Sequence, residues 1–276
     1  MLFIRYTKGF FLLNIVVCVK QVPDPEAPPS VYQTDSDGRH ITCRGAPPVI
    51  STYDENALEA ALKIKDSQEC RMAVLSLGHK LSKAVLRKTL AAGADELVLL
   101  DDYTFADLDG FATAASLSAA ISKLGQCDLV LTGIQAADTN AGIVGIGIAE
   151  LLGIPCITNA RAIKVKENSI LIEQALPDGW RCLEVTLPVV ITVNKSLGDL
   201  RSIPAAALMA AQKKLLTQWT AADLGINPAD QIKTRLLGVY IPRRESIVEM
   251  VGGADDSEKG NNLAEKLFDT GILKKS

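Results

Sequence analysis

Five short runs of consecutive apolar residues place the strongest constraint on how this chain can fold. A strand that is covered on both faces needs continuous rather than alternating hydrophobicity, so each run predicts a buried strand of a parallel sheet. The runs are residues 14–19 (NIVVCV), 71–77 (RMAVLSL), 96–100 (ELVLL), 128–132 (DLVLT) and 188–193 (PVVITV).

Four segments with helical periodicity lie between these runs. They are residues 54–66, 80–95, 107–125 and 142–153. Ser51, with Asp54 three residues later, resembles a capping box at the start of the first segment, and Gly93 is a typical stop signal for the second. The alternation of strand and helix predicts an α/β fold with a doubly wound, mostly parallel sheet and right-handed crossovers.

Three other segments depart from this alternation. Residues 161–187 alternate apolar and polar positions around the turn sequences KEN and PDG, which predicts an antiparallel ribbon added to the sheet. From about residue 220 the chain is polar and rich in turn residues, so we expect an extended C-terminal arm over 220–276 that wraps a partner or the parent domain. Residues 1–13 are expected to lie outside the core, or translation begins near Leu13. The α/β domain then spans 14–219.

Charge and cysteine usage restrict the class of partner. Lys and Arg number 29 against 32 acidic residues, and this balance gives no electrostatic reason to expect nucleic acid or an anionic membrane. The apolar stretch from Phe10 to Val19 is interrupted by Asn14 and is too short to span a bilayer, so we expect neither a signal peptide nor membrane insertion. Six cysteines without a C-x-x-C pair and two histidines predict no metal site and reduced thiols in a cytoplasmic protein.

The loops after the predicted strands carry the candidate binding groups. In open α/β sheets ligands bind beyond the carboxyl ends of the strands, where residues 20–24 (KQVPD), 51–55 (STYDE), 78–80 (GHK) and 132–145 (TGIQAADTNAGIVG) are expected to meet. The last loop leads into a glycine-rich helix start, whose free N–H groups and dipole favour a phosphate. Its glycines do not follow the G-x-G-x-x-G order. The alternative is that they only allow the helix to pack closely on the sheet.

Side-chain catalysis is not indicated by these loops. Asp138, a single acid near a helix start, is more typical of a cap, and His79 has no nucleophile paired with it. Ser51 and Tyr53 likewise lack a neighbouring base, and the sequence contains no G-x-S-x-G elbow, Walker loop or pair of carboxylates in a catalytic motif. The loops therefore predict binding.

Six motifs in order resemble the β subunit of electron transfer flavoproteins, a family that includes FixA-type proteins. They are VKQVPD (19–24), YDENALEAALKIKD (53–66), LAAGADE (90–96), TGIQAADTNAGIVG (132–145), LPVVITV (187–193) and LGDLRSIPAAALMAAQKK (197–214). The resemblance extends over residues 14–226 and implies an adenine-nucleotide alpha-hydrolase-like domain whose C-terminal arm contacts an α subunit. It implies no independent catalysis by side chains, because the chemistry belongs to the cofactor.

The resemblance also implies cofactors and partners. FAD is held mostly by, or shared with, the α subunit, and AMP or a second FAD occupies a pocket in the β subunit. Electrons then pass between acyl-CoA dehydrogenase-type partners and a quinone reductase, ferredoxin or NADH, with electron bifurcation left open. Two other classes remain as alternatives. A flavin-free adenine-nucleotide sensor of the universal stress protein type would act alone or as a homodimer and bind ATP, and an NAD-dependent dehydrogenase would need the missing glycine fingerprint.

Site residues are implied by position in the matching motifs. The expected cofactor-binding residues are Cys18, Val19, Lys20, Ser51, Thr52, Tyr53, Asp54, Ser76, Gly78, Thr132, Gly133, Gln135, Asp138, Asn140, Ala141, Gly142, Ile143, Val144 and Gly145. Leu197 matches the leucine that anchors the dehydrogenase partner. The middle of the nucleotide loop lacks the Gln or Thr side chains of the family, so phosphate binding is expected to depend on backbone N–H groups. Leu200 replaces the usual proline, which predicts a less rigid docking loop.

Overall fold

The computed structural model describes residues 12–273 apart from positions 37, 40 and 243–247. The chain divides into two compact units, one extending to Val239 and one beginning at Tyr240. Residues 1–11, which make up most of the expected N-terminal extension, lie outside the described residues. Strand β1 begins at Leu13, and this residue is fully buried.

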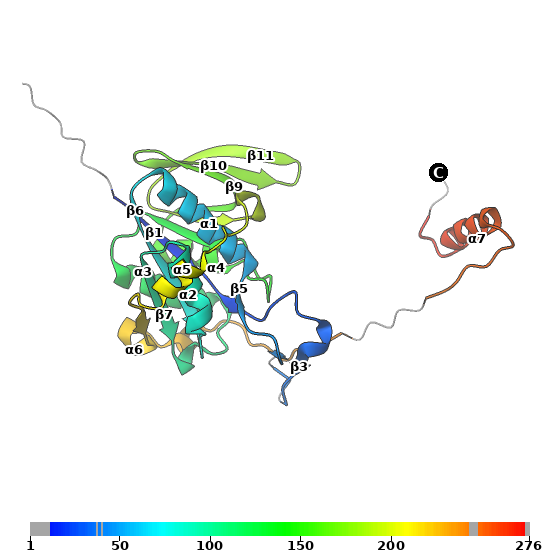
Figure 1. The fold of residues 1–276 in the computed structure, drawn as a ribbon, viewed down its shortest axis with the longest axis horizontal. Coiled ribbons are helices and arrows are strands. Elements are labelled where there is room, and N and C mark those ends of the chain that lie inside the picture. Colours follow the sequence, from blue (N-terminus) through cyan, green and yellow to red (C-terminus); the bar gives the residue numbers. More distant parts are fainter. Residues whose placement is uncertain (1–11, 37, 40, 243–247, 274–276) are drawn as a thin grey trace, which may run out of the picture. The chain divides into compact units, whose positions relative to one another are not determined.

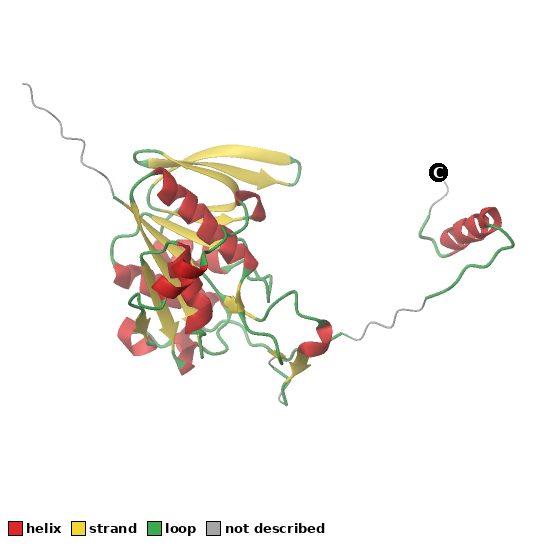
Figure 2. Ribbon diagram, in the orientation of Figure 1, coloured by secondary structure: helices red, strands yellow, loops and turns green. Residues whose placement is uncertain are grey.

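Within the described residues of the first unit, a nine-stranded sheet forms the centre of the fold (Figure 1). Its strand order is β11-β10-β9-β12-β8-β1-β6-β7-β13. The parallel strands are β1 (Leu13–Cys18), β6 (Cys70–Gly78), β7 (Glu96–Asp101), β8 (Leu129–Gly133), β9 (Cys156–Val165), β12 (Val189–Val193) and β13 (Thr217–Trp219). The antiparallel ribbon continues from β9 into β10 (Ser169–Leu176) and β11 (Gly179–Thr186), as Figure 2 shows in yellow.

Helices cover both faces of this sheet. On one face lie α1 (Thr52–Ser67), α2 (Lys83–Ala92) and α5 (Ala205–Ala211), which share one hydrophobic cluster. On the other face lie α3 (Gly110–Leu124), α4 (Val144–Leu152) and α6 (Ala221–Leu224), which share a second cluster. The predicted doubly wound, mostly parallel sheet with an added antiparallel ribbon is therefore confirmed. Strand β13 and helices α5 and α6 are additions to the predicted elements.

The first strand shows why the apolar runs are continuous. Leu13, Ile15 and Val17 enter the first cluster, whereas Val16 and Cys18 enter the second. Since successive side chains of a strand point to opposite faces, a strand between two helical layers needs apolar residues on both faces. The burial of β1 accounts for its lack of polar alternation.

Shorter elements complete the description. They are β2 (Gln21–Val22), which pairs with β5 (Val49–Ile50), β3 (Tyr32–Thr34), which pairs with β4 (Ile41–Cys43), and the 3₁₀ turns Pro29–Val31, Tyr103–Phe105, Lys195–Leu197 and Pro228–Gln231. No helix in the described part of the chain is long and apolar enough to cross a membrane.

The C-terminal part of the chain is divided between the two units. Residues 220–239 belong to the first unit, where Leu224 and Ile226 contact the second cluster and the backbone N–H groups of Lys233 and Thr234 donate to Asp109, both at 2.7 Å. From Tyr240 onward a separate unit contains α7 (Asp256–Asp269), whose N-cap Asp255 accepts a hydrogen bond from Glu258 N–H.

Sheet topology identifies the position where a ligand site is expected. The chain moves outward from β1 to β6 and β7, and then returns to the opposite side of β1 to form β8 and β12. Strands β1 and β8 are therefore parallel neighbours whose connections leave in opposite directions. This reversal is a topological switch point, and ligands of open α/β sheets bind outside the carboxyl ends of the strands there.

Candidate functional site

Three elements meet at the switch point between β1 and β8. The end of β1 leads to Lys20, the end of β8 leads from Gly133 into the loop 134–143, and the first turn of α1 lies against both. Buried Asp54 joins them. Its carboxylate accepts the N–H of Lys20 at 2.8 Å through one oxygen and the N–H of Gly133 at 3.1 Å through the other. The carboxylate is therefore committed to holding the framework of the site.

The environment of Asp54 has opposing electrostatic effects. Burial is the largest and raises the pKa of the carboxyl from 3.8 to about 7, while the two N–H donors, the Lys20 charge and Ser51 oppose it. Ser51 is the N-cap of α1, but its hydroxyl makes no capping bond and instead accepts the N–H of Ala137 at 3.2 Å. The predicted capping box is thus wrong, because both of its side chains bind the loops facing the helix.

Gly133 is required by the close approach of α1. A β-carbon at this position would lie 2.6 Å from Asp54 Oδ1 and 2.7 Å from Tyr53 Cβ, well inside van der Waals contact. The end of β8 can therefore meet the first turn of α1 only when no side chain intervenes.

An ion pair connects the loops that follow β1 and β8. Lys20 Nζ lies 2.7 Å and 2.9 Å from the two carboxylate oxygens of Asp138. Helix α4 begins at Val144 with Ile143 as its N-cap, so the interpretation of Asp138 as a helix cap is wrong. Asp138 instead binds the ammonium group of Lys20 and keeps it next to the β8 loop.

The β8 loop is closed by hydrogen bonds of its own. Gln135 Nε2 donates to Asn140 Oδ1 at 2.9 Å, and the N–H of Asn140 donates to the carbonyl of Ala136 at 2.8 Å. Asn140 and Gly142 have φ angles of 51° and 66°, values that Asn and Gly adopt more readily than other residues. The loop thereby turns toward the start of α4.

The start of α4 presents main-chain donors. Its N-cap Ile143 makes no side-chain capping bond, so the first N–H groups of this nine-residue helix have no side-chain acceptor there. Gly145 and Gly147 have a different role. Added β-carbons would lie 2.6 Å from Thr132 Oγ1 and 2.8 Å from Ala114 Cβ, respectively, which confirms that these two glycines allow close packing.

The residues expected to bind a cofactor divide by exposure. Buried are Cys18, Val19, Ser51, Asp54, Ser76, Thr132, Gly133 and Gly145, and exposed or half-buried are Lys20, Thr52, Tyr53, Gly78, Gln135, Asp138, Asn140, Ala141, Gly142, Ile143 and Val144. Cys18 packs inside the second cluster, where burial raises the pKa of its thiol above the usual range. The Ser76 hydroxyl, although fully buried, has no partner among the described residues. Among the buried residues, Ser51, Asp54 and Gly133 hold the framework, and the second set is accessible to a ligand.

The expected docking residue Leu197 lies in the 3₁₀ turn Lys195–Leu197, which follows β12. Its side chain is half-buried against the first cluster, and so is that of Leu200. Sequence reasoning missed the side chains of α1 that bind this segment, above all Glu59, which pairs with Arg201. The sequence signal was Glu59 itself, a charged residue between the apolar residues Leu58 and Ala60, which indicates a buried charge that needs a partner.

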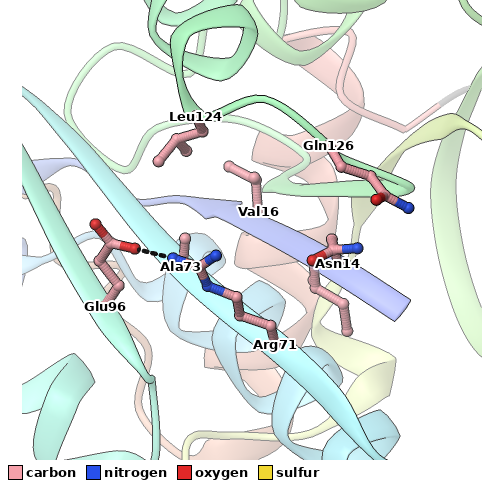
Figure 3. A pocket seen from close by; sticks show the side chains of 8 residues that line it. Asn14, Val16, Arg71, Ala73, Glu96, Leu124 and Gln126 are labelled. Atoms are coloured by element: carbon pink, nitrogen blue, oxygen red, sulfur yellow. Dashed lines mark hydrogen bonds and ion pairs between the residues drawn. The ribbon is translucent and has the colours of Figure 1, made fainter. Parts of the chain in front are cut away.

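Two other groups of side chains make contacts of their own. His79 makes an edge contact with Tyr103, with ring centroids 5.8 Å apart. A small pocket at the opposite edge of the sheet is lined by the amino ends of β1, β6 and β7, where Arg71 and Glu96 point toward each other and pair at 2.8 Å (Figure 3). Among the described residues, no group of three or more His, Cys, Asp or Glu side chains is placed to hold a metal ion.

The fold and its site define a class: a doubly wound α/β protein with a switch-point site that presents main-chain donors and a lysine. Comparison with known proteins narrows the class. The electron transfer flavoprotein domain family matches residues 41–224. Caffeyl-CoA reductase-Etf complex subunit CarD of Acetobacterium woodii is 34% identical over 95% of this chain and 100% of its own length.

Two further relatives agree with this assignment. The electron transfer flavoprotein subunit beta of Clostridium acetobutylicum is 38% identical over 79% of this chain and 82% of its own. Protein FixA of Azotobacter vinelandii is 33% identical over 93% of this chain and 95% of its own length. The chain belongs to the electron transfer flavoprotein family, among its β subunits and FixA proteins, and this membership implies a flavin in the complex in which it acts.

Proposed function

We propose that this chain is the β subunit of a heterodimeric electron transfer flavoprotein. It carries electrons between acyl-CoA-type dehydrogenases and a quinone reductase, ferredoxin or NADH, through an FAD that the α subunit holds or shares. The observation that carries the proposal is the switch-point site, which offers binding groups in a chain whose relatives are Etf subunits. The redox chemistry belongs to the flavin, and the chain supplies position and charge.

We infer that the switch-point site binds an adenine nucleotide, either AMP or a second FAD. The uncapped N–H groups at the start of α4 and the Lys20 ammonium are suited to phosphate oxygens. Lys20 is half-exposed, with 42% of its side chain accessible, so a phosphate can reach it beside Asp138. The exposed residues of the loop 134–143 would then contact the nucleotide, while Asp54 and Gly133 hold the loop in place.

The C-terminal unit supports the proposed α partner. Its described residues expose large apolar side chains that a partner would cover: Tyr240, Val248, Met250, Leu263, Phe268 and Ile272. The C-terminal unit taken by itself buries no residue of its helix α7. We therefore propose that residues 240–276 bind the α subunit, and that the complex works in the cytoplasm.

The names of two relatives indicate the kind of electron-exchanging partner. One belongs to a caffeyl-CoA reductase-Etf complex, and another is the acryloyl-CoA reductase electron transfer subunit gamma of Anaerotignum propionicum, 30% identical over 95% of this chain. We propose a flavoprotein that acts on a CoA ester as the partner of this chain, with Leu197 in the docking segment.

Extraction of bound nucleotides from the purified native complex tests the proposal. A yellow heterodimer containing two FAD molecules supports the bifurcating form, and one FAD together with AMP supports simple transfer. A flavin-free homodimer that releases ATP on denaturation would refute the proposal in favour of the adenine-nucleotide sensor. The same extraction from a Lys20→Met complex shows whether the nucleotide held by this chain is the one affected.

A further inference from the structure

Side chains of α1 bind the main chain of residues 195–201 at successive points. Asn56 Nδ2 donates to the Gly198 carbonyl at 2.7 Å, and Lys63 Nζ donates to the Leu197 carbonyl. The N–H of Arg201 donates to Glu59 Oε2 at 3.0 Å. The backbone of this segment is therefore fixed at three of its seven residues by one helix.

The Arg201 guanidinium strengthens this attachment. It binds both oxygens of Glu59 at 3.0 Å and reaches Asp66 Oδ2 at 2.7 Å. Only 5% of the Glu59 side chain is exposed, so its negative charge depends on Arg201 for compensation. The two carboxylates raise the pKa of Arg201 above its usual range, which keeps the guanidinium charged. We call Arg201 and the four α1 residues that bind this segment the loop clamp; the four are Asn56, Glu59, Lys63 and Asp66.

Spacing shows that the clamp is one feature of α1. Asn56, Glu59, Lys63 and Asp66 follow one another at intervals of three, four and three residues, which places them on a single face of the helix. The neighbouring Lys65 has a different role, because it pairs with Asp95 and the Gly93 carbonyl near the start of β7. The clamp residues of α1 therefore contact residues 195–201, whereas Lys65 contacts the residues that precede β7.

We propose that the loop clamp positions residues 195–201 for docking of the electron-exchanging flavoprotein partner, with Glu59 and Arg201 as positioning residues that act through Leu197. This inference rests on the proposed function, in which Leu197 contacts that partner. Fixing the segment before association removes conformational entropy that docking would otherwise have to remove. Leu200 stands where the family usually has proline, and the clamp supplies the rigidity that was expected to be missing.

The clamp makes a prediction that a purely stabilising network does not. A stabilising network affects unfolding alone, whereas a positioning network affects the concentration of partner needed for half-maximal transfer. We expect Arg201→Gln in the complete heterodimer to raise KM for the dehydrogenase partner about tenfold, with kcat at saturation and flavin content unchanged. Lys63→Met, at an exposed side chain, should raise KM severalfold and provides a second variant with little risk to folding.

Lys65→Met is the matched control. It removes a lysine of the same helix that, like Lys63, donates to a main-chain carbonyl, but its partners Gly93 and Asp95 lie outside the docking segment. Its KM should equal that of the wild type. Arg201→Lys keeps the charge but not the fork geometry and should restore part of the loss. Thermal unfolding of each complex reports any change of stability separately from KM.

A double-mutant cycle with Leu197→Ala separates the two proposals. If Arg201 acts through Leu197, the KM effects of the two substitutions are less than multiplicative, because either change alone disables the same contact. Multiplicative effects, or an unchanged KM in both Arg201→Gln and Lys63→Met, would overturn the positioning role while docking at Leu197 stands. An unchanged KM in Leu197→Ala would overturn docking at this segment, and the heterodimer proposal would still be judged by its flavin.

Discussion

Asp54 offers a direct measurement of how burial competes with hydrogen bonding at the site. Burial raises the pKa of this carboxyl to about 7, whereas the ordinary value of 3.8 applies to the unfolded chain. Between these values the folded protein holds a proton that the unfolded chain has released. The contribution of Asp54 to the free energy of unfolding therefore falls as the pH rises from about 4 to about 7, by about 4 kcal/mol at about 1.4 kcal/mol per pH unit.

Asp54→Asn removes this titration and keeps the shape of the side chain. The amide has one acceptor oxygen, so its NH₂ group faces the N–H of either Lys20 or Gly133. The loss of this hydrogen bond should lower the free energy of unfolding by about 1–3 kcal/mol at low pH. As the pH rises, the difference in unfolding free energy between variant and wild type should move in favour of the variant by up to about 4 kcal/mol.

Urea unfolding of the full-length chain between pH 4 and pH 8 measures this difference. Other carboxyls titrate in both proteins and cancel. Asp66→Asn provides a control whose difference from the wild type should stay nearly constant above about pH 5, because Arg201 lowers the pKa of Asp66 and this carboxyl is then ionised in both the folded and the unfolded chain. A difference for Asp54→Asn that stays constant, or moves against the variant, would refute the reasoning. It would mean that the two N–H donors outweigh burial.

Two further substitutions test the framework and the ligand-facing part of the site separately. Gly133→Ala should lower the free energy of unfolding by about 2–5 kcal/mol, because the new methyl group collides with α1 and disturbs a buried hydrogen bond. Gly142→Ala should lower it by only about 1–2 kcal/mol, because the φ angle of Gly142 is positive. Equal losses of the two variants in chemical denaturation would contradict this ranking. Lys20→Met should change stability by less than about 1 kcal/mol, since its ion pair is partly exposed. It should nevertheless reduce nucleotide affinity roughly tenfold by calorimetry, and unimpaired affinity would exclude Lys20 from phosphate binding.

The sheet was predictable because burial on both faces leaves a local signal. Each strand of the central group shows a run of apolar residues, and the ribbon of residues 161–187 shows alternation. Strand β13 lacks such a signal, since it is three residues long and includes Thr217 and Gln218. It forms because β7 has a free edge to pair with. Tertiary pairing at an edge cannot be deduced from a short polar segment.

The contacts of the site were much less predictable. Asp54 binds Gly133 across 79 positions, and Arg201 binds Glu59 across 142, so no periodic pattern links the partners. At short range, Ser51 and Asp54 show the spacing of a capping box whether their side chains turn back to the helix or forward to a loop. The sequence therefore indicated the loops that contain Ser51, Asp54 and Gly133, and the tertiary structure assigns Asp54 and Ser51 to the framework that joins them.

The end of β1 also explains how a nucleotide-type site can begin at a strand without a glycine loop. The N–H of Lys20 is engaged by Asp54, and its carbonyl accepts the N–H of Ser51 at 2.9 Å, so the main chain after β1 is used to attach α1. Pairing of β2 with β5 returns the chain to that helix. Main-chain donors remain available at the start of α4 instead, on the other side of the switch point. The contribution of β1 is the Lys20 side chain, which reaches Asp138 in the β8 loop, and a glycine at position 20 would remove that charge.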